Sequence, residues 1–468
     1  MSGVTDISQL PRRFEGYVLC ERDIKIDAAD DERAFLVMER TRTSTVYING
    51  KLIGSQNSLC SPHRYDITEF AGKGEVKLTV VIDNVSCPVP GGHMTSQDTQ
   101  TNWLGILGRI CIEYAGAVRA ENVRIYTDPE TMTARVTGNV TGSGRVEAFR
   151  DGFGSASADV SDGSFDIAVN MNGASLWSEH DPKMYTMNIS CGKDKVTVPF
   201  GMRKFTAKGT EFRLNGDKIF LRGKHDGMIF PLTGYAPMDK ESRLRVMSNA
   251  KAHGINHYRF HTCCPPEAVD ELGIYMEPEL PFRDTVEDEI APSQQYLTDE
   301  GFRILDSFGN HPSFFAMSLG NELWDSKERL NSILGGYKAY DDRHLYTQGS
   351  NNFQFRPVIV ENDDFFVGVR FSKERLFRGS YAMCDAPLGH IQTDAPNSPY
   401  TYGANIRPAS VSSSESLGGT IEIQYGTGVK TVNIDSGRGK GAYARKALHL
   451  HRQSRHQSRG ENLIKMRR

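Results

Sequence analysis

A glutamate stands at the end of one apolar run in a position that suits catalysis. Residues Phe314-Phe315-Ala316-Met317 have the length and apolarity of a buried strand, and Ser318-Leu319-Gly320-Asn321-Glu322-Leu323-Trp324 follows directly. This pattern predicts a carboxylate, Glu322, at the carboxyl end of a strand, where barrel enzymes build their active sites. The alternative is an ordinary surface loop, in which the carboxylate has no chemical role.

The wider stretch 310–324, Asn-His-Pro-Ser-Phe-Phe-Ala-Met-Ser-Leu-Gly-Asn-Glu-Leu-Trp, resembles glycoside hydrolase family 2. This is the family of β-galactosidases and β-glucuronidases. In its members, Asn-Glu after the fourth barrel strand carries the acid/base catalyst, with the asparagine beside it on the sugar's 2-hydroxyl. The resemblance, which extends over about residues 12 to 430, implies that Glu322 is the acid/base and Asn321 its neighbour.

Two histidines stand where the family's first and second barrel strands deliver sugar contacts. His225 follows the short strand-like run Lys218-Ile219-Phe220-Leu221, and His261 ends the run that begins at Ile255. A lone histidine at a strand end is more often structural, but two at matching positions favour sugar binding by both. Relatives often carry asparagine where this chain has Lys224, which leaves the role of that residue open.

Acidic side chains end the next predicted strand, 274–281. The resemblance favours Glu279 as a sugar ligand, with Glu277 as the alternative, because carboxylates orient hydroxyls and stabilise positive charge at the anomeric carbon. Relatives often have an aromatic residue and glycine after Leu-Pro-Phe, whereas this chain has Arg283-Asp284. Helices are predicted at 241–254, 267–272 and 300–308, and a fifth strand at 344–349. Such alternation indicates a parallel TIM barrel, assigned to residues 205–435.

A retaining glycosidase also needs a nucleophilic carboxylate about 5 Å from the acid, and none is found in the sequence. Glu361 ends an apolar run but lies only 361 − 322 = 39 residues past Glu322, too early for the family's nucleophile strand. Glu415 lies inside Ser412-Ser413-Ser414-Glu415-Ser416, with no apolar strand before it. We therefore expect an incomplete barrel and almost no hydrolysis by this chain.

The first 120 residues read as short strands, with Asn49-Gly50 as a strong hairpin signal. Their order resembles the family's sugar-binding jelly roll, here without its first strands. Residues 98–108 resemble the segment that closes this domain and approaches the catalytic pocket. That likeness makes Asn102 and Trp103 candidate sugar ligands, although Trp103 as packing between domains is an equal alternative.

Two further regions complete the predicted order of domains. Residues 121–204 read as a second β-sandwich, and the stretch 176–185 resembles the signature of the family's immunoglobulin-like domain, in which Trp177 packs in the sandwich. Residues 436–468 hold ten Lys or Arg against one acid, Glu461, with few apolar residues. We interpret them as a disordered, non-native tail.

Composition excludes several other classes of protein. A net charge of −3 gives no bulk attraction to nucleic acid or membranes, and no stretch approaches the roughly 18 apolar residues of a membrane span. No signal peptide is visible at the start, so the localisation stays open. The 8 cysteines are scattered, with Cys263 and Cys264 adjacent, which indicates reduced thiols rather than a disulfide frame or zinc site.

The sequence thus predicts a multidomain chain with a jelly roll, an immunoglobulin-like β-sandwich and an incomplete TIM barrel. The resemblance implies a retaining β-glycosidase of β-galactosidase type, which acts on a carbohydrate without a cofactor or metal. A β-glucuronidase, another β-glycosidase of the family, or a non-catalytic carbohydrate-binding remnant are the alternatives. Nucleic-acid binding through the tail rests on local charge alone. The oligomeric state is open.

Overall fold

The structure is a computed structural model. It describes residues 3–5, 16–86, 89, 102–209, 211–227, 236–237, 239–264, 269–286, 292–350, 352, 359–367, 400–401, 419–425, 428–434 and 464–467. Two compact units divide the chain: Met1–Leu376 with Asp394–Gly403, and Phe377–Thr393 with Ala404–Arg468. None of the described helices is long and apolar enough to cross a membrane.

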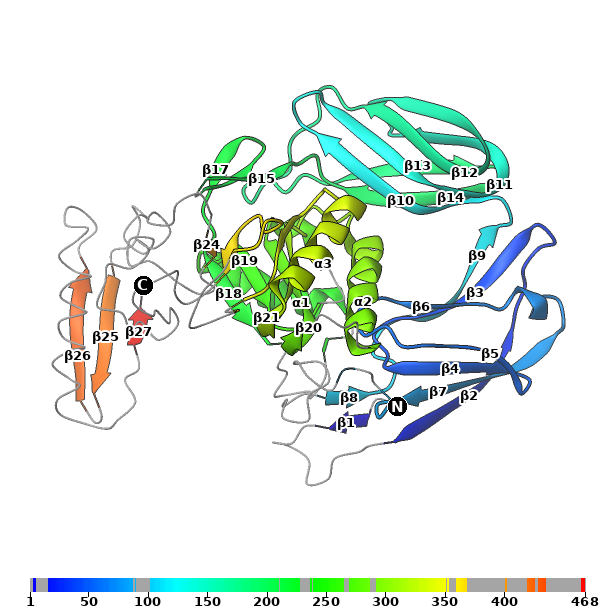
Figure 1. Cartoon of the computed structure of the whole chain (residues 1–468), viewed down its shortest axis with the longest axis horizontal. Coiled ribbons are helices and arrows are strands. Elements are labelled where there is room, and N and C mark those ends of the chain that lie inside the picture. The colour runs from blue at the N-terminus through cyan, green and yellow to red at the C-terminus, as the bar shows by residue number, and fades with distance from the viewer. Residues whose placement is uncertain are drawn as a thin grey trace. The chain divides into compact units, whose positions relative to one another are not determined.

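The amino-terminal β region of the first unit, residues 16–116, holds a four-stranded and a three-stranded antiparallel sheet (Figure 1). The first runs in the order β2 (Tyr17–Lys25), β7 (Glu75–Asp83), β4 (Thr43–Ile48), β5 (Lys51–Gln56). The second runs in the order β6 (His63–Asp66), β3 (Glu32–Met38), β9 (Ile110–Gly116), and a 3-10 helix, η1, spans Thr68–Phe70. The predicted hairpin is confirmed, since Asn49 and Gly50 join β4 to β5 with φ of 49° and 79°. Apolar side chains that alternate along β3, β4 and β7 form the core of this region.

The second β region forms one five-stranded antiparallel sheet. Its strands are β10 (Arg119–Asp128), β11 (Thr133–Phe149), β12 (Ser155–Asn170), β13 (Tyr185–Cys191) and β14 (Asp194–Phe200). The first part of β11 pairs with β10, and its last residues pair with β13. Strand β12 pairs with β11 along almost the whole length of β11.

The prediction for Trp177 is wrong. Its side chain is fully buried, but among Phe205, Tyr275 and Phe315 rather than in the core of the second β region. The indole Nε1 donates to the carbonyl oxygen of Asp270 at 3.0 Å. Trp177 therefore packs this region against the start of the barrel.

A small antiparallel sheet, β15 (Phe205–Lys208), β16 (Glu211–Leu214) and β17 (Asp217–Ile219), precedes the barrel strands. Five parallel strands follow in the order β18 (Gly223–Asp226), β19 (His257–Phe260), β20 (Tyr275–Val286), β21 (Ala316–Asp325), β22 (Leu345–Thr347). The helices between them are α1 (Lys240–Ala252), η2 (Asp270–Leu272), α2 (Pro292–Phe308) and α3 (Lys327–Tyr340). These elements, β18–β22 with α1–α3, form a half-barrel (Figure 1).

Several predicted boundaries differ from the observed ones. Helix α2 begins at Pro292, eight residues before the predicted start at Glu300, because proline suits the first helical turn. Of the predicted helix at 267–272, the described part is only the short η2. Strand β21 begins later than predicted and continues through Glu322, so the glutamate lies within the strand instead of after it.

Two apolar layers enclose the five parallel strands. Outward-facing side chains such as Tyr258, Phe260 and Met317 pack against the helices, together with Leu59 and Cys60 from the amino-terminal β region. Side chains from β15 and β16 pack with Tyr275 and Phe315. Toward the carboxyl ends of the strands, the inner face carries polar residues such as Arg259, Glu279 and Ser318.

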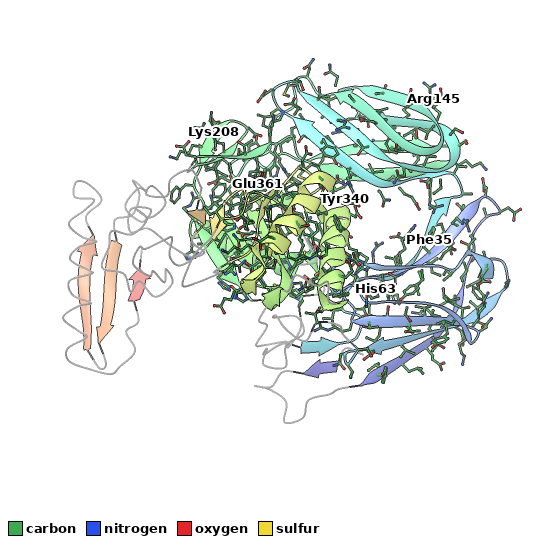
Figure 2. All side chains as sticks on the ribbon, in the orientation of Figure 1. Phe35, His63, Arg145, Lys208, Tyr340 and Glu361 are labelled. Carbon is green, nitrogen blue, oxygen red and sulfur yellow. The ribbon has the colours of Figure 1, made fainter. Side chains whose placement is uncertain are left out.

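Polar contacts join both β regions to the helices of the half-barrel. Glu300 on α2 is fully buried, and its Oε1 accepts hydrogen bonds from Ser58 Oγ, Leu59 N and Cys60 N at 2.8–2.9 Å. Arg124 on β10 donates to Asp306 at 2.7 Å, and its guanidinium lies 3.9 Å from the ring centroid of Tyr340 (labelled in Figure 2).

Strand β23 (Phe366–Val367) pairs in parallel with β24 (Tyr400–Thr401). In the second unit the described residues form one antiparallel sheet of β26 (Gly428–Ile434), β25 (Gly419–Tyr425) and β27 (Ile464–Arg467). Strand β27 is the described part of the basic segment 436–468. The chain is thus multidomain and mostly sheet, with a half-barrel; the jelly-roll and immunoglobulin-like assignments, and the disordered tail, stay predictions.

Candidate active site

The inner face of the half-barrel is polar because side chains alternate along its short strands. On β19, Tyr258 and Phe260 point to the outer apolar layer, whereas His257 and Arg259 bond to carboxylates of β20. Both inner side chains are at least 95% buried. Buried charges persist only when they are paired, so the charged side chains on this face need partners of opposite charge.

Arg259 is the centre of that network. Its Nε donates to Glu279 Oε1 at 2.7 Å, and its Nη2 donates to Asn321 Oδ1 at 2.9 Å. Its Nη1 lies 3.3 Å from His225 Nδ1, which makes that ring nitrogen the acceptor. One guanidinium therefore connects three residues that the sequence assigned to the site.

Glu279 is fully buried and receives donors from several strands. Besides Arg259, its Oε1 accepts Ser350 Oγ at 2.5 Å and Ser318 Oγ at 3.3 Å, and its Oε2 accepts Thr262 N at 2.9 Å. Its acceptor sites are thus engaged by the chain itself. This arrangement suits a residue that holds Arg259 in place, and direct contact with a sugar stays a prediction.

Asn321 and Glu322 lie in the carboxyl-terminal half of β21, on the side of the half-barrel where the site is located. Asn321 is 5% exposed, and because its Oδ1 accepts from Arg259, its Nδ2 remains as the donor for a ligand. Glu322 is partly exposed and has a φ of 57°, a left-handed conformation that is unusual for glutamate. Its backbone N–H donates to Ser350 O at 2.8 Å.

The two predicted histidines are stacked. The ring centroids of His225 and His261 are 4.7 Å apart, with 21° between the planes. His261 N donates to the carbonyl oxygen of Asp226 at 2.8 Å, which ties the end of β19 to the end of β18. The structure thus brings His225, His261, Glu279 and Asn321 together around Arg259.

Glu277 lies with His257 in a separate buried pair. Glu277 Oε2 is 3.0 Å from His257 Nε2, and neither side chain is more than 1% exposed. Its other oxygen, Oε1, has no hydrogen-bond partner. The preference for Glu279 over Glu277 as a sugar ligand stays a prediction.

Other predicted candidates fall outside this cluster or outside the described side chains. Asn102 and Trp103 lie in β8 (Asn102–Leu104), which pairs with β1 (Gly3–Thr5); their side chains lie outside the described part of the chain. The side chains of Arg283 and Asp284 and all of Glu415 also lie outside it. Lys224 Nζ donates to Asp226 Oδ2 at 2.9 Å. Glu361 is exposed in a turn (Figure 2).

Three of the described carboxylates that follow β21 have structural partners. Asp341 binds Arg343 at 2.6 Å, and Asp364 binds Lys338 at 2.7 Å. Asp363 accepts the backbone N–H of Gln348 at 2.6 Å, and burial raises its pKa to about 6. These residues hold the end of β22 in place.

The cysteines beside the site are thiols. Cys263 and Cys264 follow β19 and are buried free cysteines, as predicted. Burial raises the pKa of Cys263 well above its usual value, which disfavours the reactive thiolate. Among the described residues, no three His, Cys, Asp or Glu side chains are grouped in a way that suits a metal ion.

Sequence reasoning missed three site residues: Arg259, Ser318 and Ser350. Arg259 had a usable signal, because it stands two residues before His261 and strand side chains alternate with a period of two. The serines had none, since their partner Glu279 lies on another strand.

Chemically, the site combines one partly exposed carboxylate with a guanidinium, an amide and two imidazoles. Such groups supply donors and acceptors in several directions, which fits a ligand rich in hydroxyl groups. A partly exposed carboxylate in the last part of β21 is also suited to proton transfer.

The chain was compared with known proteins. It is 25% identical over 326 residues to a putative β-glucuronidase of Formosa agariphila. The matched region covers 62% of this chain and 39% of that relative. The chain is 23% identical over 317 residues to a β-galactosidase of Oenococcus oeni, covering 59% and 30%, respectively. The chain therefore spans about a third of the length of these curated relatives. No family model matches it.

Solved structures share the fold. An FMN-binding β-glucuronidase from Facaelibacterium prausnitzii L2-6 superposes with a TM-score of 0.63 at 19% identity, over 74% of this chain and 58% of that one. A β-glucuronidase from an uncultured Clostridium sp. gives 0.61 at 22% identity, over 76% and 67%. A glycosyl hydrolase family 2 member from Bacteroides cellulosilyticus gives 0.60 at 18% identity, over 75% and 49%.

The chain is multidomain and contains a parallel α/β half-barrel. A polar site lies on the inner face of this half-barrel, at the carboxyl ends of its strands. The curated relatives carry the names β-galactosidase and β-glucuronidase, and the solved neighbours share the fold. The resemblance to glycoside hydrolase family 2 is thereby confirmed.

Proposed function

We propose that this chain carries the sugar-binding and acid/base part of a retaining β-glycosidase that acts on terminal β-linked sugars. Glu322 is the acid/base, Asn321 binds the sugar's 2-hydroxyl, and His225 and His261 bind further hydroxyls. Arg259 and Glu279 hold these groups in position.

The observation that carries this proposal is the contact set of Arg259. Its donors reach Glu279, Asn321 and His225 at 2.7–3.3 Å, and these residues come from three different strands. A buried cation that fixes the amide beside a strand-end carboxylate is a costly arrangement for a purely structural core. Such preorganisation is what a sugar-processing site requires.

In the proposed mechanism, Glu322 first protonates the leaving oxygen and later removes a proton from the attacking water. The intervening covalent step needs a second carboxylate about 5 Å away. We assign no residue to that role: Glu361 is exposed in a turn, and Glu415 lies outside the described residues.

We infer a β-galactoside as the substrate, with a β-glucuronide or another β-glycoside as the alternative. Relatives of both names match at similar identity, 23% for the Oenococcus oeni β-galactosidase and 24% for a Paenibacillus borealis β-glucuronidase. The choice therefore needs direct measurement with each sugar.

The second candidate function is carbohydrate binding without turnover. It is favoured by the engagement of Asp341, Asp363 and Asp364 in structural contacts, so that none of these three is assigned as the second carboxylate. Both functions use the same sugar site, so one set of variants tests them together.

The test measures binding and hydrolysis of aryl β-galactoside, β-glucuronide and β-mannoside by the purified chain. We expect one of them to bind, and binding to weaken about five- to tenfold in Asn321→Ala, since a lost ligand hydrogen bond is worth about 1–1.5 kcal/mol. The control is Glu328→Gln, an exposed acid in the first turn of α3. Hydrolysis that disappears in Glu322→Gln indicates an enzyme, and binding alone indicates the second candidate. If the wild-type chain binds none of the three, the proposal is wrong.

A further inference from the structure

The backbone at Glu322 is strained. A φ of 57° places the residue in the left-handed region, where the Cβ of an L-residue crowds the following carbonyl oxygen. Asparagine visits this region readily, as Asn49 and Asn215 do in the turns of this chain, but glutamate does so rarely. A strained residue persists only where its surroundings hold it.

The segment after β22 supplies that hold. Ser350 N donates to Gly320 O and Ser350 O accepts from Glu322 N, both at 2.8 Å. Leu323 N then donates to the side chain of Asn352, with 2.8 Å between N and Oδ1. These hydrogen bonds clamp the backbone on both sides of the Glu322 Cα.

The amide of Asn352 is itself fixed. Its Nδ2 donates to Gln348 O at 2.9 Å, so its Oδ1 must face Leu323 N. Asn352 is 4% exposed and Leu323 is fully buried, which means that water does not readily replace this acceptor. Without the amide oxygen, the buried Leu323 N–H would lose its partner.

We propose that Asn352 is a positioning residue for Glu322. It holds the left-handed backbone that aims the Glu322 carboxylate, while Asn321 and the two histidines bind the sugar. This inference rests on the proposed function of Glu322 as the acid/base. It predicts that loss of the Asn352 oxygen disturbs the acid and leaves sugar binding intact.

Hydrogen exchange of the full chain, read by mass spectrometry on a peptide that covers residues 319–325, tests the clamp directly. In Asn352→Ala we expect the amides of Glu322 and Leu323 to exchange about tenfold faster, the equivalent of losing one buried hydrogen bond. The matched control is Asn362→Ala, because Asn362 bonds to Asn331 on α3 through its N and Nδ2. Unchanged exchange in Asn352→Ala overturns the inference.

Asn352→Asp keeps an oxygen for Leu323 N and provides a second variant if the alanine variant does not fold. We expect it to restore slow exchange at Leu323, whereas equal loss in both variants would show that the oxygen is not the cause. With the aryl β-glycosides, Asn352→Ala should change sugar affinity less than about twofold and lower kcat about 100-fold wherever the wild type turns over. A wild type that binds no sugar contradicts the proposed function, while the exchange result still decides the clamp.

Discussion

Removal of Glu279 should destabilise the chain strongly, because it leaves the guanidinium of Arg259 unpaired. Glu279 Oε1 lies 2.7 Å from Arg259 Nε, and the two side chains are 0% and 6% exposed. Two unit charges about 4 Å apart attract by about 4 kcal/mol at an effective dielectric constant of about 20. Removal of both ions from water costs several kcal/mol each, so the pair as a whole contributes little net stability.

From these opposing effects we expect Glu279→Ala to lower the free energy of unfolding by about 3–5 kcal/mol, since one buried charge loses its partner. The double variant Arg259→Met, Glu279→Leu should lose less than the sum of its single variants, with a coupling of about 2–3 kcal/mol. Ser318→Ala is the control, because it removes a neutral donor 3.3 Å from the same carboxylate and should cost only about 1 kcal/mol.

The assay is urea unfolding of all variants. Variants are compared only where the free energy of unfolding depends on urea concentration with the same slope (m-value), so that a shifted midpoint reflects a change in stability alone. If the losses in the Arg259 and Glu279 single variants add up to the loss in the double variant within about 0.5 kcal/mol, the argument is refuted, because independent sites are additive. A Glu279→Ala variant as stable as Ser318→Ala would also refute it.

Three further predictions concern the backbone, acid stability and packing. Glu322→Gly should be more stable than Glu322→Ala by about 1–2 kcal/mol, since glycine adopts the left-handed conformation without strain; equal unfolding midpoints would contradict this. Burial lowers the pKa of His63 from 6.5 to about 4. The neutral, buried His63 therefore contributes about 3 kcal/mol to the free energy of unfolding above pH 6.5, and this contribution is lost as the pH falls through about 4. His63→Gln should flatten the pH dependence of the free energy of unfolding between these two pH values. Gly301→Ala should destabilise the chain by about 1–3 kcal/mol in thermal unfolding, because an added Cβ on α2 would lie 2.1 Å from the hydroxyl of the buried Tyr337. An unchanged or higher Tm would contradict this, since it would mean that the Tyr337 side chain moves aside without cost.

The sequence contains the local part of the site. Gly-Asn-Glu after an apolar run indicated Glu322 at a strand end, and the two histidines were placed by matching family positions. These signals work because strand side chains alternate and parallel strands end at one edge of the sheet. The half-barrel and its parallel order were predictable for the same reason.

The long-range part of the site was not predictable from one sequence. Ser350 and Asn352 reach the backbone at Glu322 from the segment after β22, and their spacing from Glu322 carries no periodic signal. Trp177 was placed in the wrong core because a buried tryptophan does not reveal which of two adjacent cores it enters. Glu300 joins α2 to Leu59 and Cys60, more than two hundred positions earlier, through backbone donors that no side-chain pattern reveals.

The most direct test of the sugar site compares the β-glycoside that binds most tightly with its 2-deoxy analogue, using the wild-type chain and Asn321→Ala. Asn321 Nδ2 is the donor left for a ligand, because Oδ1 accepts from Arg259. We predict that the wild type binds the 2-deoxy analogue about tenfold more weakly, and that this difference vanishes in Asn321→Ala. Discrimination that persists in Asn321→Ala, or equal affinity of the wild type for both sugars, would contradict the assignment of this face as the sugar site.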